Sequence, residues 1–376
     1  MKTKPLHYIT ACLFLSLLSI PSHALAPGYN VIDLGTLGGT RTVPHAINNS
    51  GQVVGFSRDA NGADRAFLWQ AGSGMIDLGT LGGSDSYAFD IDDSGRVVGD
   101  ALTATYRMRA FLWQPDTGMS DLGTFGGPGS SAKGINRFGQ IAGWASKPSY
   151  AQHAFLLNPG QPMMDLGTLG GLGSWASDVN DVAQVVGESF TSDGYERAFL
   201  WQAGIGMIDL GTLGGNEGFA AQINNSGQVV GESEIPMGPP ENLYRRAFLW
   251  EGGRGMLDLG TFGGANSSAY GIEDDGRILG FAQDLLGYNR AFVWERGTGL
   301  VDLNSLIDPA SGWHLSTAQD INDAGWIIGG GIGPAGSSRG YLLIPVPEPA
   351  GLLVLGVPLT LLLSWRRVRK NLRKER

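Results

Sequence analysis

Asp33-Leu34-Gly35-Thr36-Leu37-Gly38-Gly39 is a segment that returns six times along the chain, the last time in a degenerate form. The later copies begin at Asp77, Asp121, Asp165, Asp209, Asp258 and Asp302, with spacings of 44, 44, 44, 44, 49 and 44 residues. Two further blocks follow the same period, INNSGQVVG at 47–55 and RAFLW at 65–69. Self-similarity at a fixed period predicts one supersecondary unit repeated seven times.

Each unit holds four short stretches with strand character, separated by turn residues. In the first unit these are strand a (46–48), strand b (52–56), strand c (65–70) and strand d (75–80). The Asn-Ser-Gly sequence between strands a and b is typical of a tight hairpin turn, in which glycine takes a positive φ. Four strands in about 44 residues match the size of a β-propeller blade.

The two ends of the repeat array complement each other. A d-type strand at 31–36 precedes any a strand, and the last unit has a c strand at 341–343 but no d strand. One orphan strand at each end completes a seventh blade if the ring closes, and closure removes exposed sheet edges. An open solenoid would need polar caps at its ends instead. The sequence therefore predicts an all-β, seven-bladed propeller closed by the N-terminal strand.

Residues outside the repeats have the composition of export signals. Residues 1–26 carry Lys2 and Lys4, an apolar run and small residues, which predicts a signal peptide cut after Ala24 or Ala26. Cys12, the single cysteine, would leave with it, so no disulfide is expected. An uncharged run at 350–365, followed by seven basic residues, predicts a short transmembrane helix with a cytoplasmic tail. The expected domains are 1–26, 27–345 and 346–376.

Charge and motif content argue against several classes of function. Without both ends, 17 basic and 34 acidic residues remain, a charge of −17 that disfavours nucleic-acid binding.

The segments 90–95 and 320–325 resemble the start of a calcium loop, but position twelve counted from Asp90 is Ala101, so we expect turns. The glycine patterns at 331–336 and 336–340 lack the helix that a dinucleotide or hydrolase motif needs. His45, His153 and His314 occupy different places in the repeat, so no catalytic, cofactor-binding or metal-binding residue is expected.

Two recurring features are expected to be structural. Arg65 and Asp77 are equidistant from Ala71, which predicts a cross-strand ion pair repeated around the ring. Phe67 and Trp69, with Leu68 on the opposite face of the strand, are expected to fill the space between neighbouring blades.

The repeated blocks, including the triplet His153-Ala154-Phe155, resemble those of bacterial extracellular HAF-repeat proteins over about residues 31–344. Val346-Pro347-Glu348-Pro349, with the apolar run and basic end, is similar to a PEP-CTERM sorting signal. This resemblance implies recognition by an exosortase of a Gram-negative bacterium. It also implies an intermediate anchored in the inner membrane, release to the cell surface or matrix, and an association with exopolysaccharide and biofilm.

Three functions compete at this point. The leading hypothesis is a non-enzymatic surface or matrix protein that binds polysaccharide or a partner protein; the alternatives are a polysaccharide-acting hydrolase or lyase, and a structural spacer. Repeat-length changes fall only in the b–c connection at 231–246 and the d–a connection at 302–325, which emerge on one face of a propeller. Aromatic side chains in such connections could stack on sugar rings or anchor a partner protein; the alternative is that these loops only tolerate insertions. The predicted ligand-face residues are Trp313, His314, Tyr244, Trp175 and Tyr195.

Overall fold

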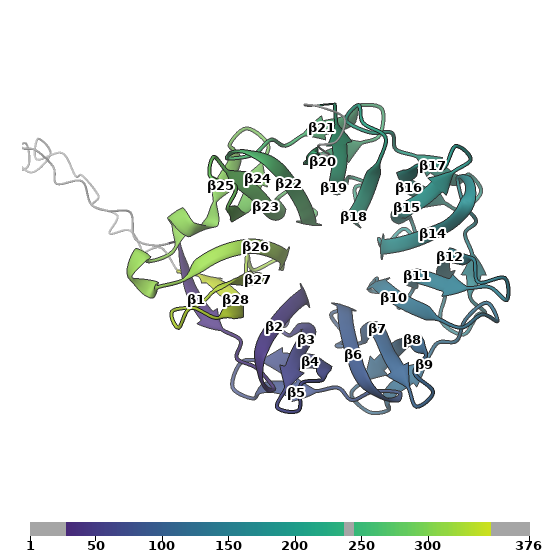
Figure 1. Cartoon of the computed structure of the whole chain (residues 1–376), viewed down its shortest axis with the longest axis horizontal. Coiled ribbons are helices and arrows are strands. Elements are labelled where there is room, and N and C mark those ends of the chain that lie inside the picture. The colour runs from purple at the N-terminus through teal and green to yellow at the C-terminus, as the bar shows by residue number, and fades with distance from the viewer. Residues whose placement is uncertain (1–27, 237–243, 347–376) are drawn as a thin grey trace, which may run out of the picture.

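The computed structural model describes residues 28–236 and 244–346, which form seven four-stranded antiparallel sheets around a central axis (Figure 1). In the first six blades the strands run in chain order, strand a nearest the axis and strand d at the rim (Figure 1). The predicted seven-bladed, all-β propeller is therefore confirmed. The predicted signal peptide, the sorting motif from Pro347 onward and the apolar tail lie outside the described residues. Within the described part of the chain, no helix is long and apolar enough to span a membrane.

The blades follow one another along the chain. Blade 1 is β2 (Gly38–Ile47), β3 (Val53–Asp59), β4 (Asp64–Gln70) and β5 (Gly74–Asp77); blade 2 is β6 (Gly82–Ile91), β7 (Val97–Thr103), β8 (Met108–Gln114) and β9 (Gly118–Asp121). Blade 3 is β10 (Ser130–Ile135), β11 (Ile141–Ser146), β12 (Gln152–Leu157) and β13 (Met164–Asp165); blade 4 is β14 (Gly170–Val179), β15 (Val185–Thr191), β16 (Glu196–Gln202) and β17 (Gly206–Asp209). Blade 5 is β18 (Gly218–Ile223), β19 (Val229–Ile235), β20 (Tyr244–Glu251) and β21 (Gly255–Asp258); blade 6 is β22 (Gly263–Ile272), β23 (Ile278–Asp284), β24 (Asn289–Glu295) and β25 (Gly299–Asp302). Blade 7 is β26 (His314–Ile321), β27 (Ile327–Ile332), β28 (Ser338–Pro345) and β1 (Tyr29–Asp33).

Blade 7 joins the two ends of the described chain. β1 pairs antiparallel with β28 and brings Val31 opposite Leu343. Backbone bonds extend the seam on both sides, from the Leu34 amide to the Gly340 carbonyl at 3.1 Å and from the Val346 amide to the Gly28 carbonyl at 3.0 Å. The N-terminal strand therefore supplies the missing rim strand, as the orphan strands predicted.

The core consists of wedges between neighbouring blades. Phe67 and Trp69 of β4 pack against Ile328 and Leu342 of blade 7, whereas Leu68 joins the cluster shared with blade 2. Alternation along the strand puts these side chains on opposite faces of the sheet, as predicted. The phenylalanines equivalent to Phe67 in the next five blades are fully buried too: Phe111, Phe155, Phe199, Phe248 and Phe292.

The a–b turns are tight hairpins held by their own side chains. In blade 1 the Gly51 amide bonds to the Asn48 carbonyl at 2.9 Å, and Gly51 has φ 73°. The Asn48 Oδ1 accepts from the amides of Ser50 and Gln52 at 3.1 and 3.0 Å. Segments 90–95 and 320–325 form the same hairpin, and the described residues contain no group of three or more His, Cys, Asp or Glu side chains that could hold a metal.

The predicted ion pair around the ring is wrong as a general rule. Phe67, not Arg65, lies opposite Asp77, so the turn is centred on Gly72 rather than Ala71. Arg65 still reaches Asp77 diagonally at 3.0 Å, and His153 takes that place beside Asp165 at 2.8 Å. In blade 6, Arg290 pairs with Asp284 instead.

The recurring aspartate has a different constant role. In six copies its Oδ1 accepts from the amide of the glycine two residues later, at 2.7–2.9 Å: Asp33, Asp77, Asp121, Asp165, Asp209 and Asp258. This bond fixes the start of each d–a turn. In the seventh copy, Asp302 accepts from Asn304 and begins the 3-10 helix η1 (Leu303–Leu306).

Candidate functional site

The innermost strands all carry a β-bulge at the same point of the repeat. In β2, Pro44 pairs with Gly55 and Ala46 with Val54, which leaves His45 without a partner. A bulged residue interrupts the ladder and re-aims its side chain. The seven bulge residues are all of different types: His45, Phe89, Lys133, Ser177, Ala221, Tyr270 and Gln319. They line a cavity of about 130 Å³ on the axis.

The residue after each bulge forms a second level. At this level the side chains are Ala46, Asp90, Gly134, Asp178, Gln222, Gly271 and Asp320. Each aspartate accepts two backbone amides, one from its own blade and one from the next. Asp320 accepts from Ile321 at 2.9 Å and from Ile47 at 2.8 Å. We call Asp90, Asp178, Gln222 and Asp320 the amide belt.

The amide belt provides an acceptor for one amide of every blade. Asp90 accepts from Ile91 and Ile135 at 2.8 and 2.7 Å. Asp178 accepts from Val179 and Ile223 at 2.7 and 3.0 Å. Gln222 accepts from Ile272 at 2.5 Å. Three carboxylates and one carboxamide thus satisfy seven amides. The three blades whose own residue at this level is Ala or Gly receive their acceptor from the preceding blade.

Burial dominates the electrostatics of the amide belt. It raises the pKa of Asp178 to about 6 and of Asp320 to about 7, and it raises the pKa of Asp90 well above its usual range. The bonded amides oppose these shifts, because they stabilise the ionised carboxylate. Since the amides occupy both oxygens of each carboxylate, we assign the belt a structural role.

A second cavity of about 380 Å³ lies on the other side of the amide belt, at the a–b turns. Its mouth is a ring of one residue per blade: Asn49, Asp93, Arg137, Asp181, Asn225, Asp274 and Asp323. Neighbours in this ring bond to each other, for example the Asn49 amide to Asp93 at 2.9 Å and the Asp181 amide to Asn225 at 2.9 Å. The mouth carboxylates therefore also serve contacts between blades.

Lys133 carries the single positive charge at the bulge level. Its Nζ lies 3.3 Å from the centre of the Phe89 ring. Burial lowers the pKa of Lys133, while the carboxylates of Asp100 and Glu188 act in the opposite direction. His45 stacks on the same Phe89 ring, with the two ring centroids 5.2 Å apart, and its Nδ1 donates to the Ala88 carbonyl at 2.8 Å. Burial lowers the pKa of His45 to about 4, so it is neutral at pH 7.

Towards the b–c and d–a connections, three blades place an acidic residue opposite an aromatic one. These cross-strand pairs are Tyr87 with Asp100, Trp175 with Glu188 and Phe219 with Glu232. Burial, followed by the charge of Glu196, raises the pKa of Glu188 to about 7. Carboxylates beside half-buried aromatic rings can bind hydroxyl groups while the ring contacts an apolar surface.

The predicted ligand-face residues do not form one site. They belong to three blades: Trp175 and Tyr195 to blade 4, Tyr244 to blade 5, and Trp313 and His314 to blade 7 or the connection before it. Trp175 is half-buried, with its Nε1 donating to Gln152 at 2.7 Å. Tyr195 is exposed, whereas Tyr244 and His314 are half-buried.

The longer d–a connection is packed into the fold rather than free. It contains η1 and η2 (Pro309–Ser311), and both Leu303 and Ile307 are buried in the cluster of blade 7. Trp313 packs edge-on against the fully buried Tyr341, with ring centroids 6.0 Å apart. A stabilising role therefore explains much of this insertion. The corresponding b–c insertion lies largely at 237–243, outside the described residues.

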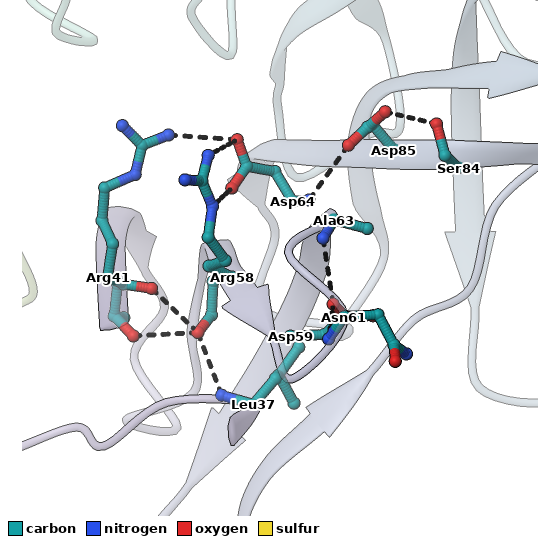
Figure 2. Close-up of polar contacts among 11 residues, drawn as sticks. Leu37, Arg41, Arg58, Asp59, Asn61, Ala63, Asp64, Ser84 and Asp85 are labelled. Carbon is teal, nitrogen blue, oxygen red and sulfur yellow. Dashed lines mark hydrogen bonds and ion pairs between the residues drawn. The ribbon is translucent and has the colours of Figure 1, made fainter. Parts of the chain in front are cut away.

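In blade 1 an ion-pair cluster covers the same face (Figure 2). Arg41 and Arg58 both contact the Asp64 carboxylate at 3.1 Å, and the Asp64 amide donates to Asp85 at 3.0 Å. The Arg41 guanidinium also lies 4.9 Å from the centre of the Phe56 ring. Here the protein's own side chains occupy the surface above that ring.

Sequence reasoning missed the bulge level and the amide belt, because it followed the residues that repeat. The signal was in the residues that do not: the seven positions two before the conserved Ile or Val of strand a hold seven different side chains. Neither the bulges nor the bonds between blades can be read from one unit alone.

No protein-family model and no curated protein matches this chain. Among solved structures it is similar to TolB from Acinetobacter baumannii, at 12% identity and a TM-score of 0.45 over 80% of this chain and 64% of that one. It is also similar to XC5397, a gluconolactonase from Xanthomonas campestris, at 13% identity and a TM-score of 0.41 over 85% and 92% of the two chains. A third similar structure is the β-propeller domain of the Trilobed protease from Pyrococcus furiosus, at 12% identity and a TM-score of 0.49 over 70% of this chain and 85% of that one. These likenesses concern the fold and not the function.

Proposed function

We propose that this chain is an exported, non-enzymatic protein of the cell surface or extracellular matrix. It binds a polysaccharide, or a partner protein, through the face that carries the b–c and d–a connections. The observation that supports this proposal most strongly is that recurring and varying residues of the repeat have different roles. Residues that recur hold turns and wedges, whereas the bulge residues and the acidic–aromatic pairs differ from blade to blade. Variation on a rigid scaffold is typical of a binding surface.

Export and sorting form the second part of the proposal. Residues 1–26 direct secretion, and an exosortase-type enzyme recognises Val346-Pro347-Glu348-Pro349 while the tail is still held in the membrane. The ring is compatible with this route, because the Val346 amide is bonded to Gly28, so the chain leaves the ring beside the point where it enters. A tail attached there can be removed without touching a blade.

One observation favours the alternative of a polysaccharide hydrolase or lyase. Glu188, with its pKa raised to about 7, and Asp100 both act on the charge of Lys133 near the axis. A carboxyl group that titrates near neutral pH can serve as a general acid or base. We prefer the non-enzymatic function, because one of these two carboxylates is already engaged within the protein: the Ser131 hydroxyl donates to Asp100 at 2.6 Å.

The test uses the purified full chain and polysaccharide extracted from the surface of the producing cells. We expect the polysaccharide to retard the protein in affinity electrophoresis while its chain length and reducing ends stay constant. Shortening of the polymer that disappears in Glu188→Gln would favour the enzyme instead. Absence of any retardation by the polysaccharide or by extracted surface proteins would contradict the proposal.

A further inference from the structure

We propose that a crevice between blades 5 and 6, on the b–c and d–a face, binds a neutral hexopyranose unit of a glycan. The inference deepens the proposed function, since it assigns a sugar class and a subsite to that face. The crevice has a volume of about 370 Å³ and is lined by Glu232, Arg245, Asn266, Phe281, Gln283 and Asn289. This volume lies within the range of roughly 300–1,000 Å³ that small-molecule sites occupy.

The polar side chains of the crevice are held in place by one another. Arg245 donates to Glu232 at 3.0 Å and to Glu217 at 3.1 Å, and its guanidinium lies 4.4 Å from the centre of the Phe219 ring. The Arg245 amide donates to the Asn266 Oδ1 at 3.0 Å. The backbone amide of Asn266 in turn donates to the Gln283 Oε1 at 3.1 Å. A fixed polar set loses little side-chain entropy on binding a ligand.

The composition of the crevice selects for a neutral polyhydroxylated ligand. Its two charged residues, Glu232 and Arg245, cancel in a domain that is otherwise strongly acidic. Carboxamides supply paired donors and acceptors, which suit adjacent hydroxyl groups. Neither a uronate nor an amino sugar would find an unpaired counter-charge here, because the Arg245 guanidinium already pairs with the Glu232 and Glu217 carboxylates.

An apolar surface is present as well. The half-buried Phe281 ring belongs to the lining, and the b–c turn next to Asn289 exposes Leu285, Leu286 and Tyr288 at 84%, 80% and 61%. Sugar rings present an apolar face of C–H groups that packs on such side chains.

Blade 1 shows what the same positions look like without room for a ligand. Asn266, Gln283 and Asn289 of blade 6 correspond in strand register to Arg41, Arg58 and Asp64 of blade 1, and Phe281 corresponds to Phe56. In blade 1 those three residues form the ion-pair cluster shown in Figure 2, and the Arg41 guanidinium of that cluster lies over the Phe56 ring. In blade 6 the shorter, uncharged carboxamides leave a crevice at the equivalent ring. The crevice in blade 6 therefore goes with carboxamides at the positions where blade 1 has its ion-pair cluster.

The test measures retardation of the full chain by dextran, a neutral glucan, in affinity electrophoresis, with alginate and chitosan as acidic and cationic comparisons. We expect binding to dextran in preference to both. Phe281→Ala should weaken that binding by about tenfold, the loss of roughly 1.4 kcal/mol of contact energy. Phe56→Ala is the matched control and should leave dextran binding unchanged.

A second variant covers the case in which Phe281→Ala does not fold. Asn266→Arg, Gln283→Arg and Asn289→Asp together copy the blade 1 cluster into blade 6, so they should preserve the fold and abolish dextran binding. Binding that survives this variant, a preference for alginate or chitosan, or no retardation by dextran overturns the assignment. The two proposals fail separately. Surface-polysaccharide binding that is unchanged in the crevice variants overturns only the crevice assignment, whereas crevice-dependent dextran binding without surface-polysaccharide binding overturns only the proposed function.

Discussion

The Asp320 carboxylate accepts a hydrogen bond of 2.8 Å from the amide of Ile47, a residue 273 positions earlier in the chain. This bond joins blade 7 to blade 1 at the axis, whereas the pairing of β1 with β28 closes the ring within blade 7, at its rim. Asn322 adds a third link, since its Nδ2 donates to the Asn48 carbonyl at 3.1 Å. The seam is therefore held at two levels, and the inner one uses the same bonds that join other blades.

Loss of a belt aspartate should cost more than loss of the belt glutamine. Asp320→Ala leaves two amides without an acceptor and Gln222→Ala leaves one, at about 1–3 kcal/mol per buried amide. We therefore expect Asp320→Ala to lower the free energy of unfolding by more than Gln222→Ala in urea titrations. Asp116→Ala, in an exposed c–d turn, is the control and should change little. Equal losses in all three variants would remove the belt as a source of stability.

The belt also predicts how stability depends on pH. Burial raises the pKa of Asp178 to about 6 and of Asp320 to about 7, so the folded state binds protons more tightly than the unfolded state. The contribution of these groups is fully present below about pH 4 and is lost as the pH rises through 6 to 7. Urea unfolding of the wild type and of Asp178→Asn/Asp320→Asn at pH 5 and pH 8 checks this. The wild type should lose more stability than the variant between the two values, and parallel losses would contradict the shifts.

The wedge phenylalanines should be the most costly side chains to remove. Phe199 is fully buried in the cluster shared by blades 3 and 4, and truncation of such a residue costs about 3–5 kcal/mol. Phe199→Ala should therefore lower the melting temperature far more than Phe138→Ala, whose side chain is 55% exposed. Calorimetry of both variants decides the matter, and comparable melting temperatures would argue against the wedge.

The predicted ligand-face residues should separate into two groups. Trp313→Ala removes the contact with Tyr341 and should lower the unfolding free energy, whereas Tyr195→Ala, at an exposed position, should not. Measuring stability together with binding to the surface polysaccharide shows whether either residue contacts a ligand. A Trp313→Ala protein with unchanged stability and lost binding would return that residue to the ligand face.

The repeat made the blades, the wedges and the closure predictable, because each follows from residues that recur or from strands left unpaired. The ion pair of Arg65 with Asp77 was generalised too far, since the turn was placed one residue early and the aspartate's constant partner is a glycine amide. The amide belt could not be predicted, because the side chain that accepts each bond from the next blade stands at a position where the residue type differs between repeats. A binding role of the long d–a connection stays a prediction; its anchoring in the core through Leu303 and Ile307 was not visible in the sequence, because no other copy of the repeat has an equivalent of Ile307.

The closed seven-bladed ring depends on pairing of the N-terminal strand β1 with β28, which a designed disulfide tests most directly. Asn30 lies opposite Ile344 in the β1–β28 pair, and neither side chain is fully buried. In a full chain with Cys12→Ser, the pair Asn30→Cys and Ile344→Cys should oxidise completely and migrate faster on a non-reducing gel. The disulfide should also raise the free energy of unfolding by about 4–5 kcal/mol, because it closes a very long loop. A pair that stays reduced under conditions in which the protein is folded, or that reacts no faster than Asn30→Cys with Asp116→Cys, would contradict the closed ring.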